Sequence, residues 1–270
     1  MRRGEAHAKI NLALVVGSLQ DDGKHEVVTV LQRIDLADVI ELSVGNGLTV
    51  SGFPGDTIVA RALTALGAAA GVEPDWSVRI TKRIPVAAGL GGGSSDAATA
   101  LLLANESLAS PLDLEQLSEI AATIGTDVPF FLQAGPQLGT GDGSHLVGID
   151  LPQDFTAVLV LPSDVRKEST AAVYAAFDAR HGALGFDERR ATLTAALAAT
   201  ARAEDFAALP TNDLAASPLA DRLRSAGAVR ADVSGAGPCV FGVFTDAARA
   251  REAGRELAAF GRTWVIAPHR

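Results

Sequence analysis

The chain has 270 residues, 48% of them hydrophobic, and a formal net charge of -9 at pH 7. This length and composition predict a folded globular protein with one large core or two smaller ones, and they argue against intrinsic disorder. An acidic average surface repels the phosphates of nucleic acids and of anionic membranes, and no long basic run offsets that charge, so we expect neither partner. No apolar stretch approaches the roughly 18 residues that a membrane span requires.

The first half of the chain predicts strands followed by alternating helices and strands. Residues 8–16 (KINLALVVG) alternate in hydrophobicity, and VVTVLQRIDL, VIELSV and LTVSG are the next predicted strands, with GNG as the turn into the last. DTIVARALTALGAAAG predicts a helix with Asp56 or Thr57 as its N-cap and Gly71 as its end. The strand WSVRITKRI, a Gly-rich run, the helix SSDAATALLLANESL and the helix DLEQLSEIAATIG follow, and the last of these ends at Gly125.

The second half begins after a change in composition near GIDLPQDF. TAVLVLP predicts a buried strand, and helical stretches fill roughly residues 168–226. The strands VRADVSG and PCVFGVF, the helix DAARAREAGRELAAFG and the strand TWVIAP complete the chain. We therefore expect two domains, at residues 1–150 and 151–270.

Cysteine and lysine are both rare in this sequence. The single cysteine, Cys239, excludes an intrachain disulfide and a cysteine-based metal cluster, which fits a location in the reducing cytoplasm. In GPCVFGVF we expect it to be a small buried hydrophobic residue. The apolar run INLALVV is short and no small-residue cleavage site follows it, so we predict no export signal. Lysine occurs only at positions 9, 24, 82 and 167, which makes each one a candidate for a specific role.

The run GLGGGSSDAAT, residues 89–99, joins a glycine cluster to two serines at a predicted helix start. Glycines let successive backbone N–H groups point at one anion, and a helix beginning at the serines adds its free N–H groups and positive end. The run has neither the lysine of a P-loop nor the context of a dinucleotide fingerprint. A flexible turn is the alternative for the glycines alone, but the complete run favours a triphosphate site.

Three segments of this chain resemble motifs of the GHMP kinases, the family of galactokinase, homoserine kinase and mevalonate kinase. PVAAGLGGGSSDAA is similar to their central ATP loop, AHAKINLAL to their N-terminal motif and SGAGPCVFGVF to their Gly-rich C-terminal motif. The resemblance implies an α+β, two-domain GHMP kinase fold, with an N-terminal domain like the ribosomal protein S5 domain 2 and a ferredoxin-like C-terminal domain. It also implies ATP as phosphoryl donor. The implied ATP-binding residues are Pro85, Val86, Ala87, Ala88, Gly89, Leu90, Gly91, Gly92, Gly93, Ser94 and Ser95.

Within this family, AKINLAL, DGKHE, GLGGGSSDAA, GTDVPFFL and NDL, in this order, most resemble the members that act on a cytidine diphosphate-linked methylerythritol. The resemblance implies transfer of the ATP γ-phosphoryl group to a hydroxyl of that small molecule, in the non-mevalonate route to isoprenoid precursors. Two alternatives stay open: another GHMP small-molecule kinase, and a catalytically silent binding protein with the GHMP fold. The presence of both Lys9 and Asp127 argues against the silent protein.

The resemblance implies two catalytic residues. Asp127 in GTDVPFF resembles the family's catalytic aspartate, which accepts the proton of the attacking hydroxyl; its alternative is a turn or N-cap residue. Lys9 resembles the partner lysine that offsets charge on the moving phosphoryl group; its alternative is a solvated surface lysine. Asn11 lies two residues after Lys9, so on a strand both side chains point to the same face and share a site, where we expect Asn11 to bind the substrate.

The implied substrate-binding residues lie in both halves of the chain. His25 resembles the family residue that recognises the cytosine ring, and Lys24 stands where family members commonly carry an aromatic residue that stacks on that ring. A lysine there contacts the base or the diphosphate instead. Tyr174 aligns with a second family aromatic, with an ordinary amphipathic-helix residue as its alternative, and Thr170 lies four residues earlier on the same helix face.

Several further residues are left with open roles. Magnesium is expected because it bridges nucleotide phosphates, and Ser94 and Ser95 either contact phosphate or magnesium or cap the helix. No metal ligand is assigned. Asn212 and Asp213 match the family segment NDL, but we derive no chemical role for them, and the sequence does not indicate the oligomeric state.

Overall fold

The computed structural model describes residues 1–45, 47–164 and 169–269. The chain packs into two compact units that alternate along the sequence. Unit 1 comprises Met1–Ala8, Leu36–Val86 and Gly91–Ala134, and unit 2 comprises Lys9–Asp35, Ala87–Leu90 and Gly135–Arg270. Asn46 of the predicted GNG turn and residue 168, the predicted start of the helical stretches, lie outside the described residues. The domain boundary expected near residue 150 stays a prediction.

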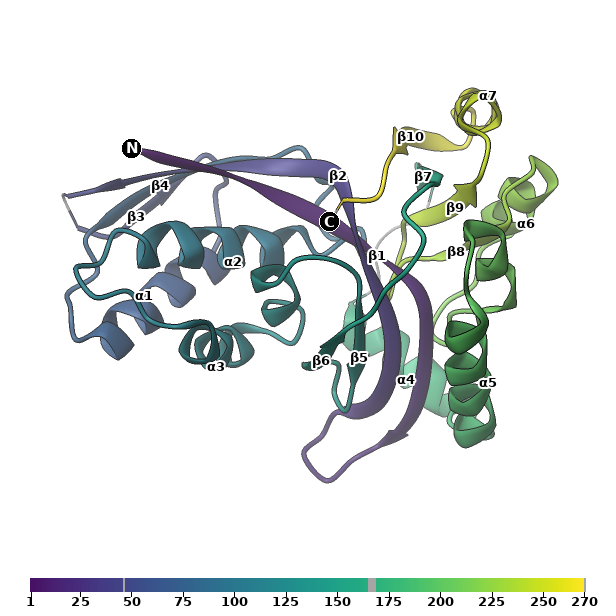
Figure 1. Cartoon of the computed structure of the whole chain (residues 1–270), viewed down its shortest axis with the longest axis horizontal. Helices are drawn as coiled ribbons and strands as arrows, with labels where there is room; N and C mark the ends of the chain where they lie inside the picture. Colours follow the sequence, from purple (N-terminus) through teal and green to yellow (C-terminus); the bar gives the residue numbers. More distant parts are fainter. Residues whose placement is uncertain (46, 165–168, 270) are drawn as a thin grey trace. The chain divides into compact units, whose positions relative to one another are not determined.

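Two long strands contribute residues to both units. They are β1 (Arg2–Leu19) and β2 (His25–Val44), which pair with each other. The other elements of unit 1 are β3 (Thr49–Ser51), α1 (Ile58–Ala70), β4 (Trp76–Thr81), α2 (Gly92–Asn105), α3 (Leu114–Ile124) and η1 (Pro129–Leu132). β4 pairs antiparallel with the end of β2 and parallel with β3, and the helices α1, α2 and α3 lie on one face of these strands (Figure 1).

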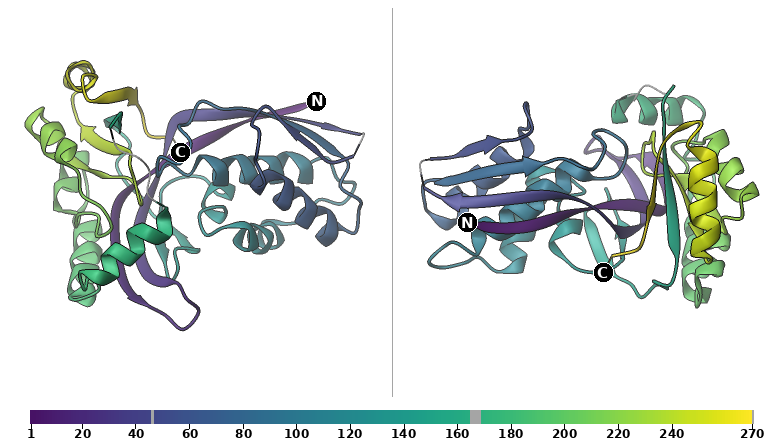
Figure 2. Two further views of the ribbon diagram at one scale, coloured as in Figure 1. Left: turned by 180° about the vertical axis from the view of Figure 1, so that it is seen from behind. Right: turned by 90° about the horizontal axis from the view of Figure 1, so that it is seen from above.

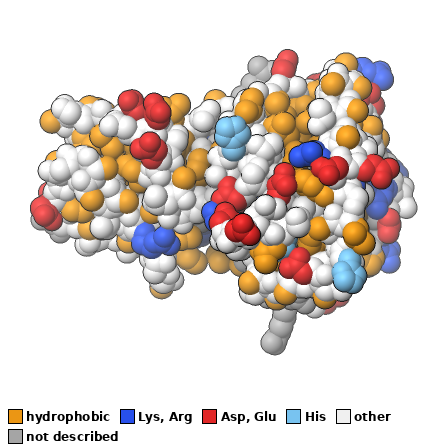
Figure 3. Space-filling view, turned by 90° about the horizontal axis from the view of Figure 1, so that it is seen from below, with side chains coloured by type: hydrophobic (Ala, Val, Ile, Leu, Met, Phe, Trp, Pro, Cys, Tyr) orange, Lys and Arg blue, Asp and Glu red, His pale blue; other side chains and the backbone are white. Residues whose placement is uncertain are grey.

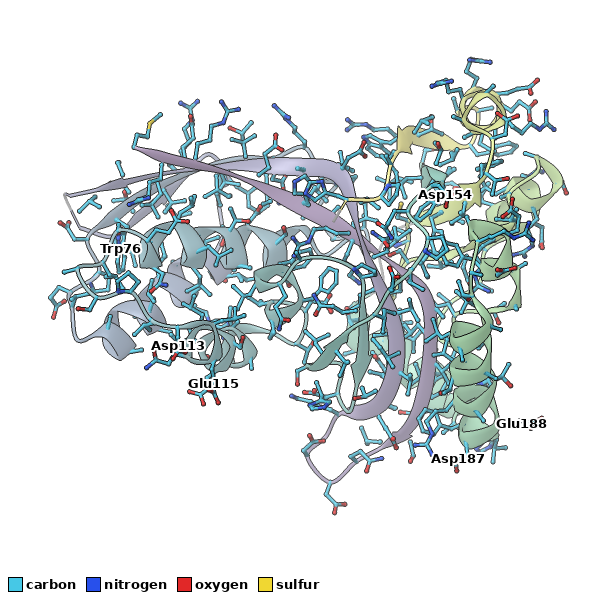
Figure 4. All side chains as sticks on the ribbon, in the orientation of Figure 1. Trp76, Asp113, Glu115, Asp154, Asp187 and Glu188 are labelled. Atoms are coloured by element: carbon cyan, nitrogen blue, oxygen red, sulfur yellow. The ribbon has the colours of Figure 1, made fainter. Side chains whose placement is uncertain are left out.

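Two helices of unit 1, α1 and α3, begin and end where their sequences predict. In α1, the apolar residues recur at helical spacing and are buried, and Gly71 ends the helix in the left-handed conformation. The α3 helix begins with a capping box, in which Asp113 and Gln116 each accept from the other's backbone N–H. Figure 4 shows Asp113 and Glu115 at this helix start, where acidic side chains favour the positive end of the helix.

Unit 2 is built on a four-stranded antiparallel sheet with the strand order β10-β7-β9-β8. Its further elements are β5 (Gln137–Thr140), β6 (His145–Gly148), β7 (Thr156–Pro162), α4 (Thr170–Ala179), α5 (Phe186–Ala199), η2 (Ala203–Ala208), α6 (Pro218–Ser225), β8 (Arg230–Val233), β9 (Val240–Phe244), α7 (Ala247–Leu257) and β10 (Gly261–Ile266). The helices lie between β7 and β8 and between β9 and β10, which is the ferredoxin-like connectivity that was expected. One apolar cluster joins this sheet to α6 and α7. Figure 2 shows α7, in yellow, beside the strands of this sheet.

A second apolar cluster in unit 2 joins the hairpin of β1 and β2 to α4. Leu14 and Val16 of β1 pack with Val27 of β2 and with Val173 and Phe177 of α4. The hairpin of β5 and β6 pairs with β2 through Thr29–Leu31. The sequence does not predict this second hairpin, because both of its strands are only four residues long.

The structure corrects one prediction about the strands. VVTVLQRIDL and VIELSV form one continuous strand, β2, although Asp38 lies between them. The Asp38 side chain is fully buried, and its Oδ1 accepts from the backbone N–H groups of Arg83 at 2.5 Å and Ile84 at 2.8 Å. These hydrogen bonds satisfy a polar residue within the strand, so it does not interrupt the strand.

The surface and the cysteine agree with the composition. On the face drawn in Figure 3, acidic, basic and hydrophobic side chains are interspersed among the described residues. Cys239 is fully buried, as predicted, and its burial raises the pKa of the thiol to about 12. A thiol with such a pKa is unreactive at neutral pH.

Candidate functional site

Two polar side chains lie together on β1 within unit 2. Lys9 and Asn11 are 4% and 5% exposed, and the Lys9 ammonium donates a hydrogen bond of 2.6 Å to Oδ1 of Asn11. Thr29 of β2 orients the Asn11 amide, because its hydroxyl accepts from Nδ2 at 2.8 Å and donates to the carbonyl of Ala13 at 2.9 Å. The prediction that both side chains share one face of the strand is confirmed. The alternative of a solvated lysine is wrong, because Lys9 is buried.

The Gly-rich segment is anchored in unit 2 through three consecutive carbonyl groups. The donors are the backbone N–H of Cys239 (to Ala88, 3.1 Å), the hydroxyl of Ser234 (to Gly89, 2.9 Å) and the backbone N–H of Lys9 (to Leu90, 3.0 Å). Each of these carbonyl oxygens therefore faces a donor of the protein, which reduces the repulsion that an approaching anion meets.

Gly89 is a point of close backbone approach between this segment and the turn after β8. Its φ is +82°, in the left-handed region, and a Cβ atom at this position would lie 2.1 Å from the carbonyl oxygen of Ser234. Only glycine fits such a backbone-to-backbone contact. The Gly-rich loop and the SGAGP turn, predicted from separate motifs, are therefore neighbours in unit 2.

The helix α2 follows the Gly-rich segment in unit 1. It begins at Gly92, two residues before the predicted start, with Gly91 as its N-cap. Ser94 and Ser95 thus lie inside the first turn, and the alternative in which a serine caps this helix is wrong. The first N–H groups of a helix have no partner within it, so this end of α2 offers hydrogen-bond donors and a positive partial charge.

Asp127 lies in the turn between α3 and η1 in unit 1. The turn follows Gly125, which ends α3, and it holds the carboxylate of Asp127 half-buried. The residue that caps η1 is Val128, so Asp127 is a turn residue and not an N-cap. The catalytic role of Asp127 stays a prediction.

His25, at the start of β2, contacts two residues of α4. Its Nε2 lies 2.8 Å from Oδ1 of Asp178, and its ring centroid lies 4.6 Å from that of Tyr174 with a tilt of 32°. Unit 2 thus brings together the predicted pair His25 and Tyr174, and it adds Asp178, which the sequence does not single out. Thr170 is exposed at the first residue of α4, one turn before Tyr174.

Lys24 forms an ion pair with Asp142, which lies in the turn between β5 and β6. The hydrogen bond to Asp142 raises the pKa of Lys24. Burial raises the pKa of Asp142, but the hydrogen bonds from Lys24 and Ser144 outweigh it and lower the pKa to about 2. The ion pair lines a pocket of about 260 Å³ together with Gln20, Asp22, His25, Glu26 and Gly141.

A buried charge cluster in unit 1 lies beside the start of α2. The Lys82 ammonium donates to Asp38 at 2.5 Å and to Asp96 at 2.7 Å, and both carboxylates are fully buried. Burial raises the pKa of Asp96 to about 7, and Lys82 offsets only part of that effect. A Cβ atom at Gly92 would lie 3.4 Å from the Lys82 ammonium, so the cluster touches the first residue of α2. The sequence predicts Lys82 within the strand WSVRITKRI, but the observed strand β4 ends at Thr81, directly before it.

No helix among the described residues is long and apolar enough to cross a membrane. Within the same residues, no three or more His, Cys, Asp or Glu side chains are grouped so that they could hold a metal ion.

Comparison with known proteins places both parts of the chain in one family. The model of the GHMP kinases N terminal domain matches residues 57–135, and the model of the GHMP kinases C terminal domain matches residues 204–263. The 4-diphosphocytidyl-2-C-methyl-D-erythritol kinase of Geobacter metallireducens is 38% identical over 97% of this chain and 96% of its own length. The enzyme of the same name from Streptomyces coelicolor is 38% identical over 94% of this chain and 91% of its own length.

Solved structures give the same result for the fold. A crystal structure of 4-(cytidine 5'-diphospho)-2C-methyl-D-erythritol kinase matches all of both chains with a TM-score of 0.81 and 30% identity. A mevalonate kinase structure matches all of both chains with a TM-score of 0.76 and 15% identity, which supports the fold alone. The predicted α+β, two-domain fold of this family is confirmed.

Proposed function

Because the chain belongs to the GHMP kinase family, we propose that it transfers the γ-phosphoryl group of ATP to a hydroxyl of 4-diphosphocytidyl-2-C-methyl-D-erythritol. Relatives named for this substrate are 36–38% identical to the chain over 92–97% of its length. The structural observation that carries the proposal is the buried hydrogen-bonded pair of Lys9 and Asn11 beside the Gly-rich segment. A silent binding protein has no chemical need for a buried ammonium at this place.

The Gly-rich segment is the proposed site of the ATP phosphates. Its carbonyl groups face donors of unit 2, and the start of α2 offers free N–H groups and the positive end of the helix dipole. We assign all of residues 85–95 to ATP binding. Ser94 and Ser95 add hydroxyl groups that can donate to phosphate oxygens.

Phosphoryl transfer needs a group that manages the proton of the attacking hydroxyl and a group that offsets charge. We assign the first task to Asp127, whose carboxylate would accept the proton. The second task falls to Lys9, whose ammonium would stabilise negative charge on the phosphoryl group in flight. Because Lys9 is only 4% exposed, its charge is screened less by water than that of a surface lysine.

The cytidine end of the substrate is assigned to the residues around His25. Oδ1 of Asp178 accepts from Nε2 of the His25 ring at 2.8 Å and fixes the orientation of the ring. We propose that His25 recognises the cytosine ring by hydrogen bonds and that Tyr174 stacks beside it. Thr170 would contact the same substrate one helical turn away, and Lys24 would contact the base or the diphosphate.

Magnesium is the proposed cofactor, since it neutralises and bridges nucleotide phosphates during phosphoryl transfer. Mg²⁺ keeps several waters and needs few protein ligands when phosphates supply the rest. The described residues fit such an ion, because hydroxyl groups lie in the first turn of α2. Ser94 and Ser95 are the residues that would approach it.

One observation favours a second candidate, a GHMP kinase with a different acceptor. Lys24 stands where the resemblance leads us to expect an aromatic residue, and Asp142 holds its ammonium at the pocket beside His25. A fixed ion pair in place of a stacking ring changes the chemistry that this pocket recognises. In either case we expect a small-molecule substrate and no nucleic-acid partner, and the single cysteine fits a cytoplasmic location.

The test is ATP-dependent phosphorylation of 4-diphosphocytidyl-2-C-methyl-D-erythritol by the purified protein with magnesium, compared with the Asp127→Asn variant. We expect transfer by the wild type and almost none by the variant. If a folded wild type binds ATP but phosphorylates only another alcohol in a panel of acceptors, the second candidate is correct. Binding of ATP without transfer to any acceptor would leave only the silent protein.

A further inference from the structure

Asn212, in the NDL segment, takes no part in the chemistry proposed above, yet its side-chain amide and its backbone N–H are all hydrogen-bonded. It is 7% exposed. Its side-chain Nδ2 donates to the carbonyls of Val233 at 2.9 Å and Gly235 at 2.7 Å, and its Oδ1 accepts from the backbone N–H of Leu214 at 2.8 Å. Its backbone N–H donates to Oδ2 of Asp232 at 2.7 Å. A residue that merely fills space does not need this set of bonds.

The two carbonyl groups that Asn212 holds lie at the end of β8 and in the turn that follows. The turn is closed by two backbone hydrogen bonds of 2.9 Å, from Ser234 to the carbonyl of Cys239 and from Gly237 to the carbonyl of Ser234. Neither bond involves the Gly235 carbonyl, which accepts from the side chain of Asn212 instead. A primary amide is the smallest neutral side chain that offers two donors and an acceptor at once, which explains the residue type.

Gly235 is in turn the backbone that lies against the Lys9 and Asn11 pair. Its φ is +56°, and a Cβ atom at this position would lie 3.3 Å from Oδ1 of Asn11 and 3.5 Å from the Lys9 ammonium. The hydroxyl of Ser234 also accepts from the backbone N–H of Asn11 at 3.4 Å. The turn therefore forms one wall of the space in which the Lys9 ammonium is placed.

We propose that Asn212 is a positioning residue for phosphoryl transfer: it fixes the Ser234–Gly237 turn and, through Gly235, the direction of the Lys9 ammonium. The inference rests on the proposed function, in which Lys9 stabilises the phosphoryl group. Without the two donated hydrogen bonds, the Gly235 carbonyl loses its partner and the turn shifts. An ammonium displaced by a fraction of an ångström then stabilises the moving charge less, whereas ATP and the alcohol still bind.

The neighbouring Asp213 has a different task. Its Oδ2 accepts from the backbone N–H of Val16 at 2.8 Å and from Nε of Arg189 at 3.0 Å, so it fastens β1 to α5. These contacts do not include the Ser234–Gly237 turn. Within NDL, Asn212 thus hydrogen-bonds to the end of β8 and the turn that follows, and Asp213 joins β1 to α5.

Two variants of Asn212 and one matched control test the proposal. Asn212→Asp keeps the size of the side chain but removes both donors, and Asn212→Ser keeps one donor and places less strain on folding. The control is Asn105→Asp in unit 1, since Asn105 is also 7% exposed and also bridges backbone, with Nδ2 to the carbonyl of Leu112 at 2.9 Å and Oδ1 from its N–H at 2.8 Å. All three variants should lower the melting temperature.

Kinetics separate positioning from stability. We expect kcat to fall at least tenfold in the Asn212 variants, with KM for the alcohol and Kd for the nucleotide within about twofold of the wild type. The Asn105 control should keep the wild-type kcat. In a Lys9→Met background, the Asn212 substitutions should lower kcat no further, because the group that they displace is then absent.

A second readout does not depend on the reaction. The chain has only four lysines, so a protein labelled with ¹³Cε-lysine gives four signals, and the signal that Lys9→Met removes belongs to Lys9. In the nucleotide-free protein, this signal should shift or broaden in both Asn212 variants and stay in place in the Asn105 control. An unmoved Lys9 signal, or an Asn212 effect on kcat that persists without Lys9, overturns the inference. A wild type that phosphorylates no alcohol overturns the proposed function instead, and the lysine signals still decide whether Asn212 positions Lys9.

Discussion

Asp96→Asn should abolish most of the fall in the stability of unit 1 that the wild type shows between about pH 4 and pH 7. Asp96 is fully buried beside Lys82 and Asp38, and burial raises the pKa of its carboxyl from the ordinary value of 3.8 to about 7. In this interval the folded protein binds a proton that the unfolded chain has lost, so the free energy of unfolding falls as pH rises. Below the interval both states are protonated, and above it both are ionised.

The size of this effect follows from the pKa difference of about 3 units, each worth about 1.4 kcal/mol. The wild type should thus lose about 4 kcal/mol of stability relative to Asp96→Asn between pH 4 and pH 8. Lys82→Met should move the fall to higher pH, because Lys82 is the charge that holds the pKa of Asp96 down.

The assay is urea unfolding followed by the fluorescence of Trp76 at pH values from about 4 to about 8. Trp76 is 3% exposed and lies in unit 1, where Figure 4 shows it on β4. The other tryptophan, Trp264, lies in unit 2, so a Trp264→Phe background makes the signal specific. Asn105→Ala serves as control, because it destabilises α2 without removing a titratable group. Equal pH dependence in wild type and Asp96→Asn would refute the reasoning.

Three further predictions concern the site. Asp127→Asn should keep the melting temperature and ATP affinity but lower kcat at least a hundredfold, as measured by coupled assay and calorimetry; near-normal turnover contradicts the base role. Lys24→Tyr should tighten the binding of cytidine nucleotides about three- to tenfold in a fluorescence titration, since an aromatic pair adds about 1 kcal/mol, and an unchanged affinity shows that position 24 does not face the base. Gly89→Ala should weaken ATP binding more than tenfold, because its Cβ would lie 2.1 Å from the carbonyl of Ser234. Gly135→Ala, with a φ of +78° but open space around it, is the control for backbone strain alone, and equal effects of the two would contradict the contact argument.

Local patterns in the sequence were sufficient for most of the secondary structure. Alternation predicts β1, helical spacing predicts α1 and α3, and Gly71 and Gly125 end those two helices as expected. The patterns fail where tertiary contacts override propensity. Gly92 is a poor helix former, yet it begins α2. The position requires a glycine, because a Cβ atom there would lie 3.0 Å from the side chain of Ile84.

The candidate site was predictable to the extent that its residues are close in sequence or carry a family motif. The Lys9 and Asn11 pair follows from the two-residue repeat of a strand, and the structure confirms it. Asp178, Asp142 and Asn212 were not assigned a role, because only the fold brings them to their partners. Asp178 lies 153 residues from His25, Asp142 lies 118 residues from Lys24, and Asn212 lies 23 residues from Gly235. No period or spacing in the sequence encodes such contacts.

Hydrogen bonds to three consecutive carbonyl groups hold the backbone of the Gly-rich segment in place before a nucleotide binds. The backbone N–H groups of Lys9 and Cys239 donate to this segment, and both should exchange slowly with deuterium whether or not nucleotide is present. The N–H groups of residues 92–94, at the open end of α2, should exchange quickly until phosphate covers them. Protection confined to those three amides would mean that the nucleotide meets a surface already in place, so little of its binding energy is spent on ordering the backbone.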